Sequence, residues 1–283
     1  MKQQIAGKRV VITGAARGIG AATATELARR GARLSLVGLE PGLLKENVAA
    51  LGDGHMWVEA DVTDQAALDA AVAATVQQLG GIDVVIANAG VANYGSIRTA
   101  DPDQFARTVG INLIGVYRTI SAAVPHLVES RGYALIVASI ASFVPLPGAA
   151  SYSASKAGVD SLAAALRLEL APFGVTVGSV HPSWIDTDLV RRSEADLPSF
   201  KKMRAEMPWP AKSTTSVEDC ARALADAVEK RAPRTFVPKA GRLLAAVRAI
   251  SFSPGLGRLL GKRISGDMAQ MDVENQALGA TWR

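Results

Sequence analysis

Short runs of consecutive apolar residues alternate along most of the chain with longer segments in which apolar residues recur at helical spacing. Such runs are typical of buried strands, and the spaced segments are typical of helices that cover a sheet. The predicted strands are 9–13, 33–37, 55–60, 82–87, 133–138, 175–180 and 235–237, and the predicted helices are 21–30, 43–51, 65–79, 101–128, 151–172 and about 217–230. Strands joined by crossover helices form a parallel sheet, so the pattern predicts an α/β fold. We expect one doubly wound domain over residues 1–240, with helices on both faces of the sheet.

Two segments fall outside this alternation. Residues 183–215 are rich in proline, serine and charge, and we expect them to be irregular. Residues 243–250 have the pattern of an amphipathic helix, which Pro254-Gly255 ends. The polar stretch 266–283 is expected to be poorly ordered. We therefore interpret 241–283 as a basic, amphipathic C-terminal helical extension.

The composition is that of a globular protein. Of the 283 residues, 49% are hydrophobic and 20% are charged, which excludes intrinsic disorder as the general state. The one cysteine, Cys220, cannot form an internal disulfide and indicates a reducing compartment. We find no secretory signal and no membrane-spanning run, so we expect a cytoplasmic protein. The three histidines stand in separate elements without metal-ligand spacing, and no metal site is predicted.

The net charge of +5 conceals an uneven distribution. Residues 230–263 carry nine Lys and Arg and no Asp or Glu, so the rest of the chain is net negative. Basic residues mixed with leucines can bind an anionic membrane surface, and peripheral membrane contact through 241–263 is one interpretation. We favour the other, a helix that packs on its own subunit or across an oligomer interface. No nucleic-acid-binding motif accompanies the positive segment, so no nucleic-acid partner is predicted.

A glycine-rich loop follows the first predicted strand and opens a helix. Its sequence is Thr13-Gly14-Ala15-Ala16-Arg17-Gly18-Ile19-Gly20. Glycines permit a tight turn and close backbone approach, and the free N–H groups of a helix N-terminus attract a pyrophosphate. A glycine-rich turn without a ligand is the alternative, because the spacing differs from the common Gly-x-Gly-x-x-Gly pattern.

Further polar residues stand where predicted strands end or helices begin. Asp61-Val62 follows the third strand, Asn88-Ala89-Gly90 the fourth and Ser139 the fifth. Tyr152 and Lys156 are four residues apart in a helix, so their side chains share one helical face. A tyrosine and lysine at this spacing are by themselves more often an exposed helix pair. The ends of strands are, however, where this fold binds ligands.

Taken in order, these motifs resemble the short-chain dehydrogenase/reductase family from residue 7 to about 240. The resemblance implies a single-domain, Rossmann-type doubly wound sheet, a substrate lid at about 183–215 and NAD(P)-dependent oxidoreductase activity on CH–OH groups. It implies a catalytic tetrad of Asn112, Ser139, Tyr152 and Lys156. The cofactor-binding residues that it implies are Gly14, Arg17, Gly18, Ile19, Gly20, Gly38, Leu39, Asp61, Val62, Asn88, Ala89, Gly90, Tyr152, Lys156, Pro182, Ile185 and Thr187.

These residue types suit hydride transfer between a nicotinamide and a carbonyl carbon, because a proton must reach or leave the oxygen. A phenol with a pKa of about 10 is a poor base near neutrality, and we expect the ammonium of Lys156 to lower that of Tyr152. Ser139 can donate a hydrogen bond to the developing oxyanion. Asn112 is expected to hold a water near Lys156.

The chain departs from the family pattern at the adenosine ribose. The family's NAD-preferring members have an acidic residue where Gly38 stands, and NADP-preferring members often have Arg where Leu39 stands. Neither is present, but Arg17 could pair with a 2′-phosphate, whereas Glu40 could reach the ribose. We therefore favour NADP(H) slightly over NAD(H).

A second departure lies beside the nicotinamide, where Pro182-Ser183-Trp184 replaces the usual Pro-Gly. Trp184 is either a core anchor or a substrate platform. The predicted substrate residues are Tyr94, Phe143, Leu146 and Trp184, and the lid adds further apolar side chains. We expect a hydrophobic secondary alcohol or ketone of steroid-like, fatty or alicyclic type.

Two other functions stay open. One is a 3-oxoacyl-thioester reductase. The other is a non-catalytic nucleotide-binding module docked by its basic tail. The resemblance also implies a homodimer or homotetramer assembled through the helices at 101–128 and 151–172.

Overall fold

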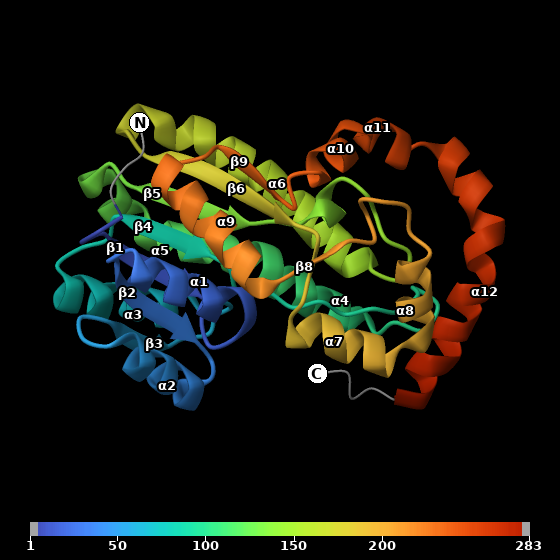
Figure 1. Ribbon diagram of the computed structural model, residues 1–283, viewed down its shortest axis with the longest axis horizontal. Helices are drawn as coiled ribbons and strands as arrows, with labels where there is room; N and C mark the ends of the chain where they lie inside the picture. The colour runs from blue at the N-terminus through green and yellow to red at the C-terminus, as the bar shows by residue number, and fades with distance from the viewer. Residues whose placement is uncertain (1–4, 279–283) are drawn as a thin grey trace.

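The computed structural model describes residues 5–278, and its centre is a seven-stranded sheet (Figure 1). All neighbouring strands are parallel, in the order β3-β2-β1-β4-β5-β6-β9. Their bounds are β1 Arg9–Thr13, β2 Arg33–Gly38, β3 Met56–Glu59, β4 Val84–Ala87, β5 Tyr133–Val137, β6 Thr176–Pro182 and β9 Arg234–Val237. The strand order reverses between β1 and β4, so the loops that follow these two strands diverge and open a crevice.

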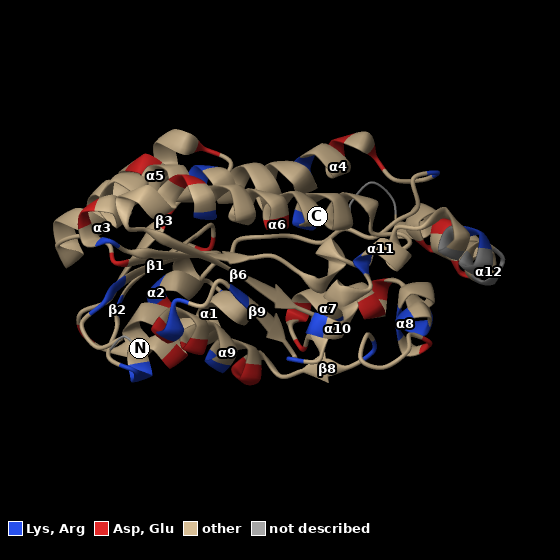
Figure 2. Ribbon diagram, turned by 90° about the horizontal axis from the view of Figure 1, so that it is seen from above, with Lys and Arg blue, Asp and Glu red and all other residues tan. Residues whose placement is uncertain are grey.

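Helices cover both faces of the sheet, as Figure 2 shows. The helices of one layer are α1 (Gly18–Arg29), α2 (Pro41–Leu51) and α9 (Val217–Lys230), and those of the other are α3 (Gln65–Leu79), α4 (Pro102–Val109), α5 (Gly115–Ser130) and α6 (Ala150–Leu170). The central strands are apolar throughout because both of their faces are covered; every residue of β4 and β5 is buried. The predicted doubly wound α/β fold is confirmed.

We predicted one helix over 101–128, and the structure differs. A π-helical turn, Gly110–Ile114, separates α4 from α5. Turns of this kind insert an extra residue into a helix and are frequent at functional sites. Asn112 lies in this turn and is fully buried.

The prediction of an irregular segment at 183–215 is wrong in part. The structure has a two-stranded sheet of β7 (Trp184–Ile185) and β8 (Thr214–Thr215), with helices α7 (Asp188–Asp196) and α8 (Pro198–Ala205) between them. Both helices are short and polar on average, and the segment is rich in proline and serine, which hid them from the sequence analysis. Their order comes from tertiary contacts, because Phe200 of α8 and Leu197 between the helices are fully buried.

The C-terminal extension is helical, as predicted, and is more ordered than predicted. It forms α10 (Gly241–Ala246), α11 (Arg248–Ser251) and α12 (Pro254–Leu278). The prediction of poor order is wrong for 266–278, because α12 packs on the subunit and buries Met271 completely. Residues 279–283 lie outside the described residues. Over the part of the chain that the structure describes, none of the helices could span a membrane.

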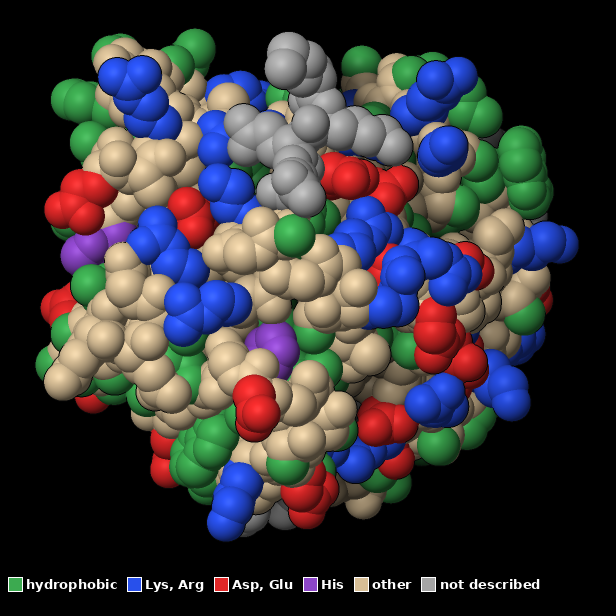
Figure 3. Space-filling model, turned by 60° about the vertical axis from the view of Figure 1, so that its left-hand side comes forward, with side chains coloured by type: hydrophobic (Ala, Val, Ile, Leu, Met, Phe, Trp, Pro, Cys, Tyr) green, Lys and Arg blue, Asp and Glu red, His purple; other side chains and the backbone are tan. Residues whose placement is uncertain are grey.

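Charged side chains of both signs lie interspersed over the described part of the face in Figure 3. Ion pairs of the structure include Arg9 with Asp83, joined Nε to Oδ2 at 2.8 Å, and Arg30 with Asp226, joined Nη1 to Oδ1 at 2.9 Å.

Gly20, near the start of α1, packs closely against the glycine-rich loop that follows β1. A Cβ atom there would overlap the carbonyl oxygen of Gly14 and lie 2.7 Å from the side-chain nitrogen of Asn88. We expect Gly20→Ala to lower the free energy of unfolding by about 1–3 kcal/mol, because the backbone must shift.

The matched control is Gly42→Ala in α2, where a Cβ would meet nothing within 4 Å. That substitution should raise stability by about 0.5–1 kcal/mol. Guanidinium unfolding of both variants measures the difference, and equal effects would contradict the close packing at Gly20.

Candidate active site

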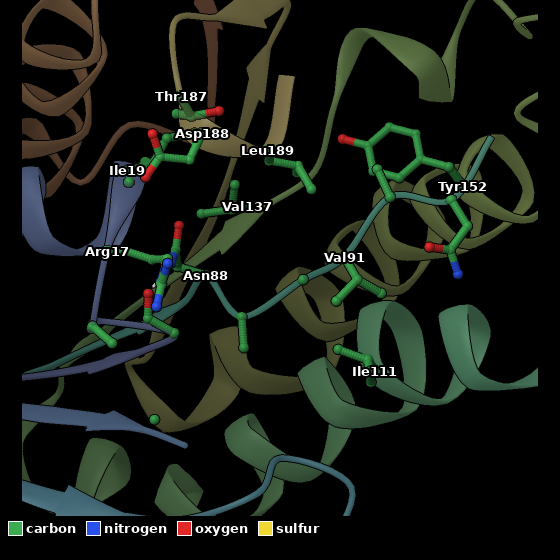
Figure 4. Close-up of a pocket in the computed structure, with 18 of the residues that line it drawn as sticks. Arg17, Ile19, Asn88, Val91, Ile111, Val137, Tyr152, Thr187, Asp188 and Leu189 are labelled. Atoms are coloured by element: carbon green, nitrogen blue, oxygen red, sulfur yellow. Dashed lines mark hydrogen bonds between the residues drawn. The ribbon is translucent and has the colours of Figure 1, made fainter. Parts of the chain in front are cut away.

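A cleft of about 970 Å³ opens at the carboxyl edge of the sheet. Figure 4 shows Arg17 and Asn88 toward one end and Tyr152 toward the other. The predicted cofactor residues that line the cleft are Gly14, Arg17, Gly18, Ile19, Gly38, Leu39, Asp61, Val62, Asn88, Ala89, Gly90, Tyr152, Lys156, Pro182, Ile185 and Thr187. Gly20 lies behind them, against Gly14.

The glycine loop is fastened to the end of β4 by backbone-directed hydrogen bonds. The amide of Asn88 donates to the carbonyl oxygens of Thr13 at 3.0 Å and Gly14 at 3.1 Å. Gly14 and Gly18 have φ angles of +64° and +57°, which side chains rarely adopt, and a Cβ on Gly14 would lie 2.7 Å from Cα of Ala89. The loop therefore brings its backbone and the N-terminus of α1 to the cleft, the arrangement that holds a pyrophosphate.

Arg17 and Glu40 face each other at the adenosine end. The Arg17 Nε donates to Glu40 Oε2 at 2.8 Å, and its Nη2 donates to the other carboxylate oxygen. Both side chains are largely exposed. Gly38 leaves space above Leu44, and Leu39 is 58% exposed. The cation that we expected at a 2′-phosphate is therefore already paired with a carboxylate.

Tyr152 and Lys156 extend from the first two turns of α6. The Lys156 Nζ donates to the carbonyl oxygen of Val137 at 2.8 Å and lies 5.8 Å from the centre of the Tyr152 ring. Lys156 is 4% exposed, and burial lowers its pKa to about 8. Burial raises the pKa of Tyr152, and a hydrogen bond with Ser139 acts in the opposite direction. The pKa of Tyr152 is therefore raised in this structure, whereas we expected Lys156 to lower it.

Ser139 and Asn112 stand behind the cleft surface. The Ser139 hydroxyl donates to the carbonyl oxygen of Pro182 at 3.4 Å and accepts from the backbone of Ala141 at 3.1 Å. Asn112 accepts from Val91 N at 2.8 Å and donates to Val91 O at 2.9 Å. The side chain of Asn112 thus fixes the chain that follows β4, and the π-helical turn positions it to do so.

A polar group that the sequence analysis missed lies beneath Ser139. His181 is fully buried, with Nδ1 3.4 Å from the carbonyl oxygen of Ser139 and Nε2 3.5 Å from Asp160 Oδ1. Arg234 donates to the same Asp160 oxygen at 3.0 Å. Burial lowers the pKa of His181 to about 4, so the imidazole is neutral at physiological pH. From the sequence, only the position of His181 near the end of the sixth strand indicated that it lies near the site.

The four predicted substrate residues do not line the cleft. Tyr94 and Trp184 pack against Phe200, with ring centroids 4.2 and 5.5 Å apart, and Leu146 borders the same apolar cluster. The Trp184 indole donates to the carbonyl oxygen of Ala211 at 2.7 Å, as a core anchor does. Phe143 packs on His181 at 4.9 Å. These side chains therefore support the wall and do not form its surface.

Beyond the predicted cofactor residues, the cleft is lined by residues that the sequence analysis did not assign to the site. The apolar ones are Val91, Ala92, Ile111, Leu189, Val190 and Leu278, and the polar ones include Asn93, Arg107, Arg192, Ser193 and Asp196. Val91, Ile111 and Leu189 are visible in Figure 4. Leu278 belongs to α12, so the C-terminal extension contributes to the cleft. Within the described residues, no group of His, Cys, Asp and Glu could hold a metal ion.

Comparisons with known proteins agree with this geometry. The family model for short chain dehydrogenase matches residues 8–198. Trans-4-hydroxycyclohexanecarboxylate dehydrogenase of Sinomonas cyclohexanicum is 36% identical over 198 residues, which are 67% of this chain and 76% of that enzyme. L-rhamnose 1-dehydrogenase (NAD(P)(+)) of Azotobacter vinelandii is 36% identical over 210 residues, or 71% and 82% of the two chains.

A solved structure shows the same likeness. The 3-ketoacyl-(acyl-carrier-protein) reductase from Brucella melitensis, in complex with NADH, superimposes with a TM-score of 0.72 at 28% identity, over 82% of this chain and 97% of that one. The matched residues include the glycine loop, Tyr152 and Lys156. The chain is therefore an NAD(P)-dependent oxidoreductase that belongs to the short-chain dehydrogenase family.

Proposed function

We propose that this enzyme interconverts a hydrophobic secondary alcohol and its ketone, with Tyr152 as the general acid and base. The observation that carries the proposal is the placement of Tyr152 and Lys156 at one end of a cleft whose other end is a glycine loop. The loop fits a dinucleotide, because its glycines leave space that side chains would fill. A bound nicotinamide supplies or accepts the hydride.

The residues around Tyr152 divide the proton chemistry among them. The phenol gives its proton to the carbonyl oxygen during reduction, and its raised pKa keeps it protonated until then. The ammonium of Lys156 stabilises the phenolate that remains, and it does so in a site from which water is largely excluded. Ser139 is proposed to exchange its hydrogen bond to the Pro182 carbonyl oxygen for one to the substrate oxygen. Asn112 holds the Val91 backbone beside the substrate and is proposed to hold a water near Lys156.

The surface around Tyr152 supports an apolar substrate of steroid-like, fatty or alicyclic type. Val91, Ala92, Ile111, Leu189, Val190 and Leu278 are among the residues that line the cleft, and apolar burial contributes roughly 25 cal/mol per Å². The Sinomonas relative is named for a cyclohexane substrate, which supports the alicyclic class. The four predicted substrate residues would then influence the substrate indirectly, by supporting the residues that line the cleft. These four are Tyr94, Phe143, Leu146 and Trp184.

A 3-oxoacyl-thioester reductase is the second candidate. The likeness to the Brucella reductase favours it, as do Arg107 and Arg192, two exposed cations at the cleft that could bind an anionic carrier. A non-catalytic nucleotide-binding module is disfavoured, because the chain retains a Ser139–Tyr152 hydrogen bond and places Lys156 Nζ 5.8 Å from the centre of the Tyr152 ring.

For the cofactor we keep NADP(H) slightly ahead of NAD(H). Arg17 supports it, because no carboxylate stands at Gly38 to repel a 2′-phosphate. Glu40 opposes it, because it neutralises Arg17 and must release it. The two cofactors are therefore expected to differ modestly in affinity.

Assembly and location complete the proposal. Apolar side chains exposed on α4, α5 and α6, including Phe105, Tyr117 and Leu168, support a homodimer or homotetramer. The free, buried Cys220 supports a reducing compartment such as the cytoplasm.

We expect Tyr152→Phe to lower kcat for reduction of cyclohexanone by about 10²–10⁴-fold, because the phenylalanine has no proton to give. The dissociation constant for NADPH, measured by fluorescence titration, should change by less than about twofold, since the ring itself remains. Tyr117→Phe on α5, where the side chain is 54% exposed, is the matched control. Near-wild-type turnover by the Tyr152 variant would refute the assignment.

Burial of Lys156 predicts a pH dependence of stability. The pKa falls from 10.5 to about 8 on folding, so between these values the unfolded chain binds more protons and stability rises with pH. Relative to Lys156→Met, the wild type should gain up to about 3 kcal/mol between pH 7.5 and pH 10.5. Urea unfolding of both proteins across this range measures the difference, and a difference that is constant or falls with pH would contradict the buried ammonium.

The Arg17–Glu40 pair predicts a shift in cofactor preference. Glu40→Gln frees Arg17 and removes a negative charge, so affinity for NADPH should rise about 3–10-fold with little change for NADH. Arg17→Gln should lower affinity for NADPH by a similar factor. Parallel titrations with NADPH and NADH test this, with Glu46→Gln on α2 as the control, and equal responses of the two cofactors would place the 2′-phosphate elsewhere.

A further inference from the structure

The C-terminal helix α12 binds the N-terminus of helix α8 in the lid. The carboxylate of Glu274 accepts hydrogen bonds from the backbone N of Ser199 at 3.1 and 3.2 Å and from its hydroxyl at 2.5 Å. Ser199 is the second residue of α8, where backbone N–H groups have no partner within the helix and negative charge is favoured. Lys202, one turn later, pairs with Asp267 at 2.9 Å. Two carboxylates of α12 therefore hold the lid helix at successive turns.

The same helix holds the loop between β4 and α4. Asp272 is 7% exposed, and its Oδ1 accepts from the hydroxyls of Ser96 and, at 3.1 Å, Thr99. Arg98 lies 3.4 Å from its other oxygen. This loop includes Val91, Ala92 and Asn93, which line the cleft.

Apolar contacts connect these two attachments. Met271 of α12 is fully buried in the cluster that contains Tyr94, Trp184 and Phe200. A Cβ on Gly148 would overlap the Met271 side chain, so the loop before α6 also packs closely against the helix. In Figure 1, α12 passes beside α8 at the end of the molecule where the sheet's carboxyl edge lies.

The last described turn of α12 reaches the cleft itself, where Leu278 forms part of the lining. We propose that α12 builds the substrate half of the active site: Asp272 and Glu274 are positioning residues, and Leu278 limits the size of the substrate. The inference rests on the proposed function for the identity of the substrate. It assigns to a segment outside the matched family region a role in selectivity for bulky apolar ketones.

The positioning claim is tested with the full-length variants Asp272→Asn and Glu274→Gln. Each should lower kcat/KM for cyclohexanone by about 10–100-fold, because small displacements of the walls disturb the reacting geometry. The dissociation constant for NADPH should stay within about twofold of the wild type, since no contact of these residues touches the glycine loop. Gln276→Ala and Val273→Ala, on the exposed face of α12, are the matched controls.

A second readout keeps this claim testable without turnover. Backbone hydrogen exchange in α8 and in residues 91–101 should become at least about fivefold faster in the two variants, while exchange in β1, β4 and β5 stays unchanged. If exchange at α8 and at 91–101 matches the wild type, α12 does not position these segments. If exchange rises equally in the central strands, the two carboxylates act on global stability and the claim is also overturned.

The selectivity claim is tested with Leu278→Trp and Leu278→Ala, using cyclohexanone and the bicyclic trans-1-decalone. The ratio of kcat/KM for decalone to that for cyclohexanone should fall at least about tenfold in the tryptophan variant and rise in the alanine variant. An unchanged ratio in both variants would overturn the role of Leu278. If the wild type reduces neither ketone although NADPH binds, the proposed substrate class fails, and the hydrogen-exchange result still decides the positioning role of α12.

Discussion

The end of the cleft at Tyr152, which we propose to be catalytic, depends on the burial of one ammonium group, that of Lys156. Its Nζ has the carbonyl oxygen of Val137 at 2.8 Å, and among the described residues no carboxylate forms an ion pair with it. A buried charge without a counter-ion is costly, which is why its pKa falls to about 8. The space around it is kept by Gly90, where a Cβ would lie 3.6 Å from Nζ and 3.2 Å from the amide oxygen of Asn112. Burial of the ammonium lowers the stability of the fold and also strengthens the electric field of the ammonium at Tyr152. Both effects arise from the low dielectric constant around the buried charge.

The half of the cleft at the glycine loop, where we propose that the cofactor binds, was predictable as a cleft lining because its determinants are local. The glycine loop, the strand before it and the helix after it are consecutive in sequence, and the signs of the φ angles at Gly14 and Gly18 follow from the turn that they form. The spacing of Tyr152 and Lys156 is likewise a property of one helix. The parallel sheet itself follows from apolar runs that alternate with helices. The site residues at the ends of its strands are those that the sequence pattern had already indicated.

The substrate half was less predictable because its order comes from contacts between distant segments. Asp272 meets Ser96 across 176 positions, and Glu274 meets Ser199 across 75. A sequence shows that residues such as Tyr94 and Trp184 are large and apolar, but not toward which side of a wall they point. In the structure they point into the cluster behind the wall, and smaller residues form its surface. The π-helical turn at Asn112 was missed for the same reason, since the hydrogen bonds to Val91 that accompany it lie 21 positions away.

This difference between the two halves has a consequence for how the enzyme can change. The cofactor half is held by the sheet and by backbone hydrogen bonds, so its geometry is tied to the stability of the fold. The substrate half is held by a few side chains of α7, α8 and α12 at the edge of the subunit, where local opening requires less free energy than global unfolding. Ser199 and Glu274 illustrate this, because their bond joins two helices that both lie outside the sheet layers. Under our proposal, a substitution at Leu278 alters which alcohol enters the cleft, whereas substitutions at Asp272 or Glu274 also disturb the geometry beside Tyr152, because these carboxylates hold the walls of the cleft.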